Sequence, residues 1–307
     1  MSELDLSDFV NWPKGRVGMV AIVGRPNVGK STFLNRALEY RLTAVSSKPQ
    51  TTRRHWRGIL STDDSQIVVV DTPGVHESSG KLGAAMMDSV RFALKDADLV
   101  LSIIDPTREW GAEDQLAAEH AAASKSPVLL VVNKCDVAGS EEKQESRAAF
   151  EAICSIVGCC EISALEGTGV DELLETVRGR LPEGPFFYPE DQLTDAIQRE
   201  IGSELIREAA FNHLREEVPH ALAVEIDSWR EEPKKTRIRA TLHVDHGSQV
   251  PIVVGRGGER LQAITREAIS GLRDQLEGRV DLKLHVKATP NWRENPQFLQ
   301  ALGLQDG

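Results

Sequence analysis

The sequence lacks the features that mark several large classes of protein. Its 307 residues contain no apolar run near the length that spans a bilayer. The first eight residues are acidic and have no apolar core of the kind found in secretion signals. These absences exclude an integral membrane protein and predict cytoplasmic residence.

Cysteine is scarce as well. The four cysteines show no C-x-x-C spacing, and no histidine is placed to complete a zinc set. We therefore expect reduced, mostly buried thiols without a redox or metal role, and a strand that holds Cys159 and Cys160. The other two cysteines are Cys135 and Cys154.

Positive charge is in short supply overall, but it is unevenly distributed. The chain has 36 Lys and Arg against 47 Asp and Glu, a formal net charge of -11. The segment from Arg230 to Glu294 departs from this balance, with 13 Lys and Arg against 9 Asp and Glu. Such a segment is either a solvated surface or a region that meets a polyanion.

The length suits two domains, each with its own core. From Gly18 to about Leu181 short apolar runs alternate with amphipathic stretches, which predicts an α/β domain with a mostly parallel sheet and helices on both faces. Ligands of such sheets bind beyond the carboxyl ends of the strands. The expected strands are Met19–Val23, Ile67–Val70, Leu99–Ile104, Val128–Val132 and Cys160–Ile162.

The first expected strand is followed by the pattern G-x-x-x-x-G-K-S and a helix start. A loop of this kind places backbone N–H groups, the helix dipole and one lysine around a polyphosphate. We expect Lys30 to neutralise the β- and γ-phosphates and Ser31 to bind Mg²⁺. The expected nucleotide contacts here are Gly24, Arg25, Pro26, Asn27, Val28, Gly29, Lys30, Ser31 and Thr32.

The second expected strand ends at Asp71, Thr72, Pro73 and Gly74. An aspartate at this place supports Mg²⁺ through water, and the Gly74 N–H meets a terminal phosphate. An ordinary Asp-Thr-Pro-Gly turn is the alternative, because proline and glycine are common in turns. The position after the strand favours a nucleotide sensor.

Two further strand ends predict a base pocket. Asp136 is an acceptor for the N1 and N2 hydrogens of guanine, which adenine cannot match, so it predicts guanine specificity. Asn133 ties this loop to the phosphate loop, and the stem of Lys134 covers the base. Beyond the last expected strand, Ser163, Ala164 and Leu165 complete the pocket, with the Ala164 N–H placed for the guanine O6.

Two stretches are expected to respond to the terminal phosphate. In the polar segment Val45–Arg54, either Thr51 or Thr52 completes the Mg²⁺ shell, and loss of the phosphate releases the loop. The second is Val75–Gly83, which shows no apolar periodicity. The residues expected to take part in hydrolysis are Lys30, Asn27, Thr51, Thr52 and Gly74.

The second half predicts a different fold. A long helix from Gln192 to Glu216 precedes two strands, a glycine loop between helices and a last strand, in the order α-β-β-α-α-β. The G-x-x-G loop lets a nucleic-acid backbone approach closely, as in KH domains that clamp about four nucleotides. The expected strands are Ala221–Trp229, Thr236–Val244 and Val280–Ala288, and the expected RNA contacts are Gly255, Arg256, Gly257, Gly258, Arg260, Lys283 and Lys287.

These signals, in this order, are similar to those of P-loop GTP-binding proteins. From about Gly18 to Gly303 the chain resembles the bacterial Era GTPases, whose linker is similar to the stretch Pro182–Asp195 here. The resemblance implies a small-subunit ribosome assembly factor that recognises the 3′ end of 16S ribosomal RNA. The expected parts are an N-terminal tail 1–16, a GTP-binding domain 17–182, a linker 183–191, a type II KH domain 192–290 and a C-terminal tail 291–307.

One position departs from many GTPases. Val75 follows the D-x-x-G glycine where a glutamine often orients the attacking water. The resemblance implies that K⁺, held partly by Asn27, supports a slow hydrolysis instead; Asn27 only shaping the loop is the alternative. A GTP-binding RNA chaperone or adaptor with negligible hydrolysis is the second reading, and a tRNA-modification GTPase or a P-loop kinase fits the motifs less well.

The sequence leaves several properties open. Mg²⁺ and GTP or GDP are the expected cofactor and ligands, single-stranded RNA is the expected partner, and DNA is not expected. A monomer is the expectation. Peripheral association with the inner face of the membrane and the nucleotide state that favours RNA stay undecided.

Overall fold

The structure, a computed structural model, describes residues 12–45, 52–77, 80–276 and 278–304. These residues form two compact units. The first holds the described residues up to Tyr40 together with His55–His76 and Val90–Asp195. The second holds the described parts of Arg41–Arg54, Glu77–Ser89 and Ala196–Gly307. Two segments within the expected domain 17–182 therefore belong with the C-terminal part.

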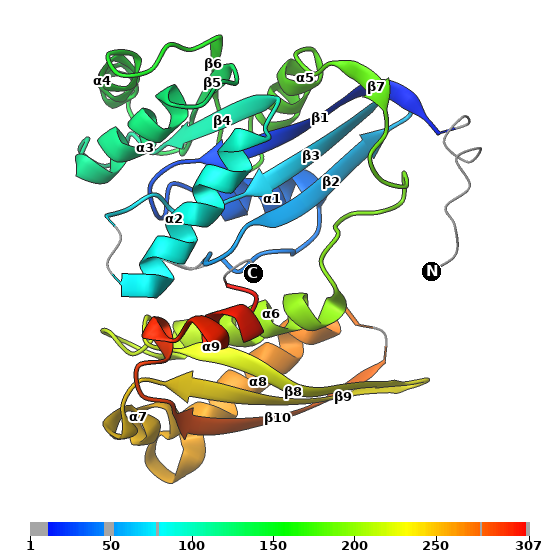
Figure 1. The fold of residues 1–307 in the computed structure, drawn as a ribbon, viewed down its shortest axis with the longest axis vertical. Coiled ribbons are helices and arrows are strands. Elements are labelled where there is room, and N and C mark those ends of the chain that lie inside the picture. The colour runs from blue at the N-terminus through cyan, green and yellow to red at the C-terminus, as the bar shows by residue number, and fades with distance from the viewer. Residues whose placement is uncertain (1–11, 46–51, 78–79, 277, 305–307) are drawn as a thin grey trace. The chain divides into compact units, whose positions relative to one another are not determined.

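A largely parallel sheet forms the centre of the first unit (Figure 1). The strand order is β2-β3-β1-β4-β5-β6, and only β2 runs antiparallel to its neighbour within that order. Strands β3, β4 and β5 are buried along their whole length, as expected of strands with both faces covered. The bounds are β1 Lys14–Val23, β2 Trp56–Thr62, β3 Ser65–Asp71, β4 Leu99–Ile104, β5 Val128–Val132 and β6 Gly158–Glu161.

Helices cover both faces of this sheet, which confirms the predicted fold class. Helices α1 and α5 pack together on one face, and α3 packs with α4 on the other (Figure 1). The bounds are α1 Lys30–Leu38, α3 Ala112–Ala122, α4 Ser140–Glu151 and α5 Val170–Arg178. Each parallel strand thus ends at one common edge of the sheet, where the motif loops lie.

The stretch expected to be a linker is attached to the first unit. Residues Glu183–Pro185 form β7, which pairs antiparallel with the start of β1. The buried side chain of Gln66 accepts hydrogen bonds from the N–H groups of Phe187 and Tyr188 and donates to the Tyr188 carbonyl. Further on, Thr194 forms a bridge with Gly58 of β2.

The second unit contains a three-stranded sheet with the order β10-β9-β8. Strand β9 pairs antiparallel with β8 and parallel with β10. The succession α6, β8, β9, α7, α8, β10 confirms the predicted α-β-β-α-α-β order of a KH domain. The bounds are α6 Gln198–His213, β8 Ala223–Glu232, β9 Lys235–Val244, α7 Val250–Val254, α8 Glu259–Arg273, β10 Arg279–Ala288 and α9 Pro296–Ala301.

The structure corrects the predicted start of the long helix. Helix α6 begins at Gln198, not Gln192, because Leu193 and Thr194 are extended and bond to β2. The side chain of Glu200 accepts the Ile197 N–H and closes the first turn. At the other end Leu214 leaves the helical conformation, so the helix stops before Glu216.

A second correction concerns the stretch Val75–Gly83. Helix α2 spans Gly80–Lys95 and so includes its last four residues, Gly80–Gly83. The Glu294 carboxylate accepts the Lys81 N–H, which has no partner inside the first helical turn. A distant acidic residue therefore supports a helix start that the local sequence does not reveal.

The smaller differences are also physical. Strand β6 holds Cys159 and Cys160, but it starts two residues before the expected Cys160 and ends one residue before the expected Ile162. Only Cys154 is buried, and the other three thiols are half-buried. Strand β8 starts two residues later than expected and extends to Glu232 as an exposed ribbon. No helix in the described part of the chain is long and apolar enough to cross a membrane.

Candidate nucleotide site and RNA interface

The phosphate loop adopts a conformation that depends on its glycines. Gly29 has a φ of 102° and leaves no room for a side chain, since a Cβ there would lie 2.2 Å from Nδ2 of Asn133. Asn27 also has a positive φ, 64°, which asparagine tolerates better than most residues. The Lys30 ammonium donates to the carbonyls of Gly24, at 3.0 Å, and Arg25, at 2.9 Å.

Lys30 is buried inside this loop. Its burial lowers the pKa from 10.5 to about 8, although Asp71 and Glu113 partly oppose the shift. A cation that has lost most of its water and contacts only carbonyl oxygens is stabilised by an added anion. The geometry and the charge therefore both favour a phosphate beside Lys30.

The end of β3 lies against this loop. The Ser31 hydroxyl donates to Asp71 at 2.7 Å, and the buried Thr72 hydroxyl donates to the Ile22 carbonyl at 2.6 Å. The Val75 N–H bonds to the Gly24 carbonyl at 3.1 Å. The predicted metal residues Ser31 and Asp71 are thus in contact, and their hydroxyl and carboxylate oxygens fit the ligand preference of Mg²⁺.

Gly74 marks the closest approach of the two loops. A Cβ at Gly74 would come within 2.7 Å of three atoms of Pro26, so only glycine fits there. The neighbouring Val75 is fully buried. The D-x-x-G turn and the phosphate loop therefore form one packed unit, as the nucleotide-sensor interpretation requires.

Asn133 joins the base loops to the phosphate loop. Its Nδ2 donates to the Val28 carbonyl at 2.6 Å, and its Oδ1 accepts the Ala164 N–H at 2.9 Å. The predicted tie through Asn133 is therefore present. The Ala164 N–H, however, is used inside the protein and does not lie free for the guanine O6, because Asn133 presents its own acceptor to it.

Lys134 and Asp136 take different roles in the loop after β5. The Lys134 ammonium pairs with Asp105 at 2.6 Å, which holds its stem in place. Burial alone would raise the pKa of Asp105, but hydrogen bonds from Lys134 and Thr107 lower it below its ordinary value. Asp136 is exposed, as an acceptor that awaits a ligand must be. Of the residues after β6, Ser163 is buried and Leu165 is exposed.

Two arginines stabilise the loops of the site through contacts that the sequence motifs do not predict. Arg25, predicted as a nucleotide contact, turns its buried side chain to Asp114 of α3 at 2.7 Å, so only its backbone faces the phosphate loop. Burial raises the pKa of Asp114, and Arg25 partly opposes the shift. Arg36 of α1 donates to the carbonyls of Ala164 and Leu165 and holds that loop.

Two threonines are candidates for the third Mg²⁺ ligand. Thr52 is buried and lies in the part of the chain that belongs to the second unit. Thr51 lies outside the described residues. The choice between them as a metal ligand stays a prediction.

The predicted RNA loop lies between α7 and α8. Gly255, Gly257 and Gly258 all have positive φ, and a Cβ on Gly257 or Gly258 would meet nothing within 4 Å. The loop is thus open on its outer side, and the Arg256 side chain is exposed there. The Arg260 guanidinium is exposed but donates to the Ile252 carbonyl, so it stabilises the loop from within.

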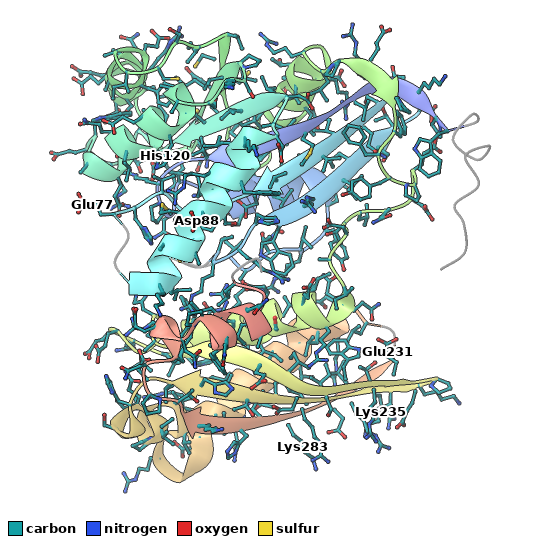
Figure 2. All side chains as sticks on the ribbon, viewed as in Figure 1. Glu77, Asp88, His120, Glu231, Lys235 and Lys283 are labelled. Carbon is teal, nitrogen blue, oxygen red and sulfur yellow. The ribbon has the colours of Figure 1, made fainter. Side chains whose placement is uncertain are left out.

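Lys283, which is labelled in Figure 2, and Lys287 lie four residues apart on β10, and both are exposed. The residues between and beside them, Leu282 and Val286, are buried. Because successive side chains of a strand point to opposite faces, the lysines leave the face that packs on the helices. They are therefore available to a polyanion, but on another face from α8.

Comparisons with known proteins agree with this geometry. A family model described as 50S ribosome-binding GTPase matches residues 19–134, and a KH domain model matches residues 217–293. The chain is 40% identical over 290 residues to GTPase Era of Clostridium botulinum strain Hall, covering 94% of this chain and 98% of that protein.

Two solved structures are similar along almost the whole chain. One is Era in complex with MgGDPNP and nucleotides 1506-1542 of 16S ribosomal RNA, with a TM-score of 0.90 and 34% identity, covering 95% of this chain and 100% of that one. The other, an Aquifex aeolicus Era variant bound to GDP and aluminium fluoride, has the same score, identity and coverage. With this identity over nearly the full length of its relatives, the chain belongs to the Era family of GTPases.

Proposed function

We propose that this Era-family GTPase couples its nucleotide state to the binding of single-stranded ribosomal RNA by its KH domain, in assembly of the small ribosomal subunit. The observation that carries this is the pairing of two sites in one chain. The loops of the first unit meet through Asn133 and Gly24 around a place for GTP, and the open G-x-x-G loop of the second unit suits RNA.

The residues divide the work of binding GTP. Lys30 and the N–H groups of the phosphate loop neutralise the phosphates, and Asp136 accepts the guanine N1 and N2 hydrogens. Ser31, Asp71 and a threonine of Val45–Arg54 hold Mg²⁺, which supplies positive charge at the β/γ bridge. Era has been solved with MgGDPNP, which supports Mg²⁺ and a guanine nucleotide as ligands of this chain. The Ala164 N–H reaches the guanine O6 only by sharing or leaving its bond to Asn133.

The RNA partner is proposed from the same relative. Era has been solved with nucleotides 1506-1542 of 16S ribosomal RNA, and this chain resembles that protein over 95% of its length. The proposed target is therefore the 3′ end of 16S ribosomal RNA, bound by a monomer in the cytoplasm. The exposed Arg256 meets a backbone phosphate, and Lys283 and Lys287 contribute a more general attraction.

The RNA proposal is tested with Gly257→Asp. Gly257 faces open space, and aspartate tolerates its φ of 60°, so the variant is expected to fold and to place a negative charge in the clamp. We expect RNA affinity to fall at least about tenfold with GTP affinity unchanged. Gly247→Asp is the matched control, because Gly247 lies in the same unit and also faces open space. Equal RNA affinity for both variants would contradict RNA binding by the G-x-x-G loop.

Hydrolysis is proposed to be slow and to use K⁺. Val75 is buried at the position where other GTPases orient water, so it supplies no polar group there. A potassium ion near Asn27 would add charge at the β/γ bridge as an arginine finger does. We expect single-turnover hydrolysis of GTP to be at least about tenfold faster in K⁺ than in Na⁺.

The control for the ion experiment is Asn27→Ala, which is expected to lose the K⁺ effect while binding GDP. The same rate in both ions would discard the role of potassium. The buried Val75 also keeps a second candidate open, a GTP-binding RNA adaptor that hardly hydrolyses GTP. No turnover in K⁺, with or without RNA of the 16S 3′ end, would favour that adaptor.

A further inference from the structure

Arg53 lies in an unusual environment for a charged side chain. It is 2% exposed, and its guanidinium donates to three carbonyls of the turn 219–222: Leu222 at 2.6 Å, His220 at 3.0 Å and Pro219 at 3.4 Å. Burial, followed by the charge of Arg207, lowers its pKa to about 9, so it stays a cation at neutral pH. Burying a cation costs desolvation free energy, and moving it away from its carbonyl acceptors costs the free energy of its hydrogen bonds.

Aromatic rings close the cage around this guanidinium. It lies 5.6 Å from the ring centre of Trp292 and 5.9 Å from that of Phe211, within cation–π range. Trp292 is itself fully buried, and its Nε1 donates to the Ala221 carbonyl at 2.9 Å. The turn 219–222 therefore binds Arg53 and Trp292 together.

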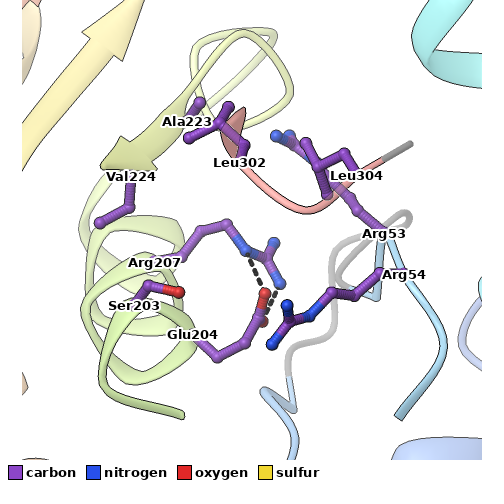
Figure 3. A pocket seen from close by; sticks show the side chains of 9 residues that line it. All are labelled: Arg53, Arg54, Ser203, Glu204, Arg207, Ala223, Val224, Leu302 and Leu304. Atoms are coloured by element: carbon purple, nitrogen blue, oxygen red, sulfur yellow. Dashed lines mark hydrogen bonds and ion pairs between the residues drawn. The ribbon is translucent and has the colours of Figure 1, made fainter. Parts of the chain in front are cut away.

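The nine residues around the pocket beside this cage are shown in Figure 3. The Arg207 guanidinium is paired there with Glu204 on the same helix. Arg54 pairs with Glu200 at 2.8 Å, so both arginines that end the segment Val45–Arg54 are held by the second unit. The pocket is lined by Arg53, Arg54, Ser203, Glu204, Arg207, Ala223, Val224, Leu302 and Leu304.

The other expected nucleotide-sensing segment, Val75–Gly83, contacts Glu294, two residues after Trp292. Both carboxylate oxygens of Glu294 lie 3.3 Å from the Lys81 N–H at the start of α2. Gly80, with a φ of 71°, lies so close that a Cβ would be 2.1 Å from a Glu294 oxygen. The residues Asn291–Glu294, which we name the receiver turn, thus contact the chain after Thr52 through Trp292 and the chain after His76 through Glu294.

An ion pair connects the receiver turn to the start of the segment that leads to the RNA loop. Arg293 pairs with the buried Asp245 at 2.5 Å. Asp245 directly follows β9 and begins the connection that leads through α7 to the G-x-x-G loop at 255–258. Arg53, Trp292, Arg293 and Asp245 therefore form a chain of contacts within the second unit, from the segment expected to sense the γ-phosphate to the connection that leads to the G-x-x-G loop.

We propose that Arg53 is a positioning residue that couples the nucleotide state to the RNA clamp through the receiver turn. Adjacent Cα atoms lie about 3.8 Å apart, so Thr52 cannot move toward a metal ion without pulling on Arg53. Arg53 cannot leave its cage without breaking several charged hydrogen bonds to the turn 219–222. A movement of Thr52 and Arg53 is therefore expected to displace this turn and, through Trp292, the receiver turn. This inference rests on the proposed function, because it requires a threonine of Val45–Arg54 to respond to GTP.

The test measures a ratio that a purely structural role would not change. The dissociation constant for single-stranded RNA of the 16S 3′ end is determined with GDPNP and with GDP, for the full chain. We expect a coupling ratio of about tenfold or more in the unmodified protein, within the usual range of allosteric coupling. Arg53→Ala is expected to reduce it to about one, with GDP affinity changed less than about twofold, because GDP lacks the phosphate that recruits the threonine.

Two further variants keep the experiment decisive. Arg147→Ala removes an exposed arginine paired only along its own helix, and it should keep the full ratio. Glu294→Ala changes an exposed side chain and is expected to fold even if Arg53→Ala does not. We expect it to reduce the ratio at least about threefold.

The outcomes separate this inference from the function on which it rests. A wild-type ratio retained by Arg53→Ala, or by Glu294→Ala if the arginine variant is unfolded, overturns the role of Arg53 and the receiver turn. Absence of RNA binding by the unmodified protein instead overturns the proposed function. By reciprocity, RNA should change the preference for GDPNP over GDP by the same ratio, and Arg53→Ala should abolish that change as well.

Discussion

The buried charge of Lys30 favours the binding of a phosphate. Its ammonium is buried among the carbonyls of Gly24 and Arg25, and burial lowers its pKa to about 8. Between that value and the ordinary pKa the unfolded chain binds more protons than the folded one. The unliganded protein therefore becomes more stable as pH rises through this interval.

Nucleotide binding should show the opposite trend with pH. A bound phosphate favours the charged form of Lys30, so binding above about pH 8 requires the uptake of a proton. We expect GDP affinity to fall with pH above about 8, by up to about tenfold per pH unit. Calorimetry at about pH 8.5 in two buffers of different ionisation enthalpy should show proton uptake. A flat affinity and no uptake up to about pH 9.5 would contradict the burial of this charge.

Some side-chain contacts of the site can be predicted from the sequence, and others cannot. The pattern around Gly24–Ser31 predicts that Lys30, Ser31 and Asp71 come together, because parallel strands end at one edge, and they do. It does not predict that Arg25 turns to Asp114, since nothing in the motif links those positions. The burial of Arg53 is hidden in the same way, because its acceptors are backbone carbonyls that carry no residue identity.

At the scale of elements, Gln66 fixes the chain that leaves the sheet. Its fully buried amide makes four hydrogen bonds, two accepted from Phe187 and Tyr188 and two donated to Ser61 and the Tyr188 carbonyl. Removing the amide leaves partly buried backbone groups of Phe187 and Tyr188 without these partners. We expect Gln66→Ala to lower the free energy of unfolding of the first unit by about 2 to 3 kcal/mol.

Urea unfolding of the variant and the unmodified protein measures this difference. Gln115→Ala is the control, because Gln115 is exposed and bonds only to Glu119 on its own helix. It is expected to change the free energy by less than about 0.5 kcal/mol. Equal effects of the two substitutions would show that the segment after β7 is not held by Gln66.

The elements that the sequence predicts well are those whose signal is local. The buried strands β4 and β5 have the predicted bounds, because continuous apolar runs between polar loops define them. Strand β7 is only three residues long and forms because Lys14–Arg16 offers it an edge. The late start of α6 and the early start of α2 depend on β2 and on Glu294, which no local pattern reports.

At the scale of the molecule, the chain does not divide where its motifs suggest. Arg41–Arg54 and Glu77–Ser89 are parts of the GTPase sequence, yet their described residues pack with the C-terminal unit. Each adjoins a residue expected to sense the terminal phosphate. This grouping is the basis of the proposed route from the nucleotide state to the RNA-binding domain.

The most direct test of the account is the affinity of the full chain for a single-stranded RNA of the 16S 3′ end in its two nucleotide states. We expect the affinities with GDPNP and Mg²⁺ and with GDP to differ at least about tenfold, and to show no such difference for a scrambled RNA. Equal affinities in the two states would contradict the coupling of GTP to RNA that is its central claim.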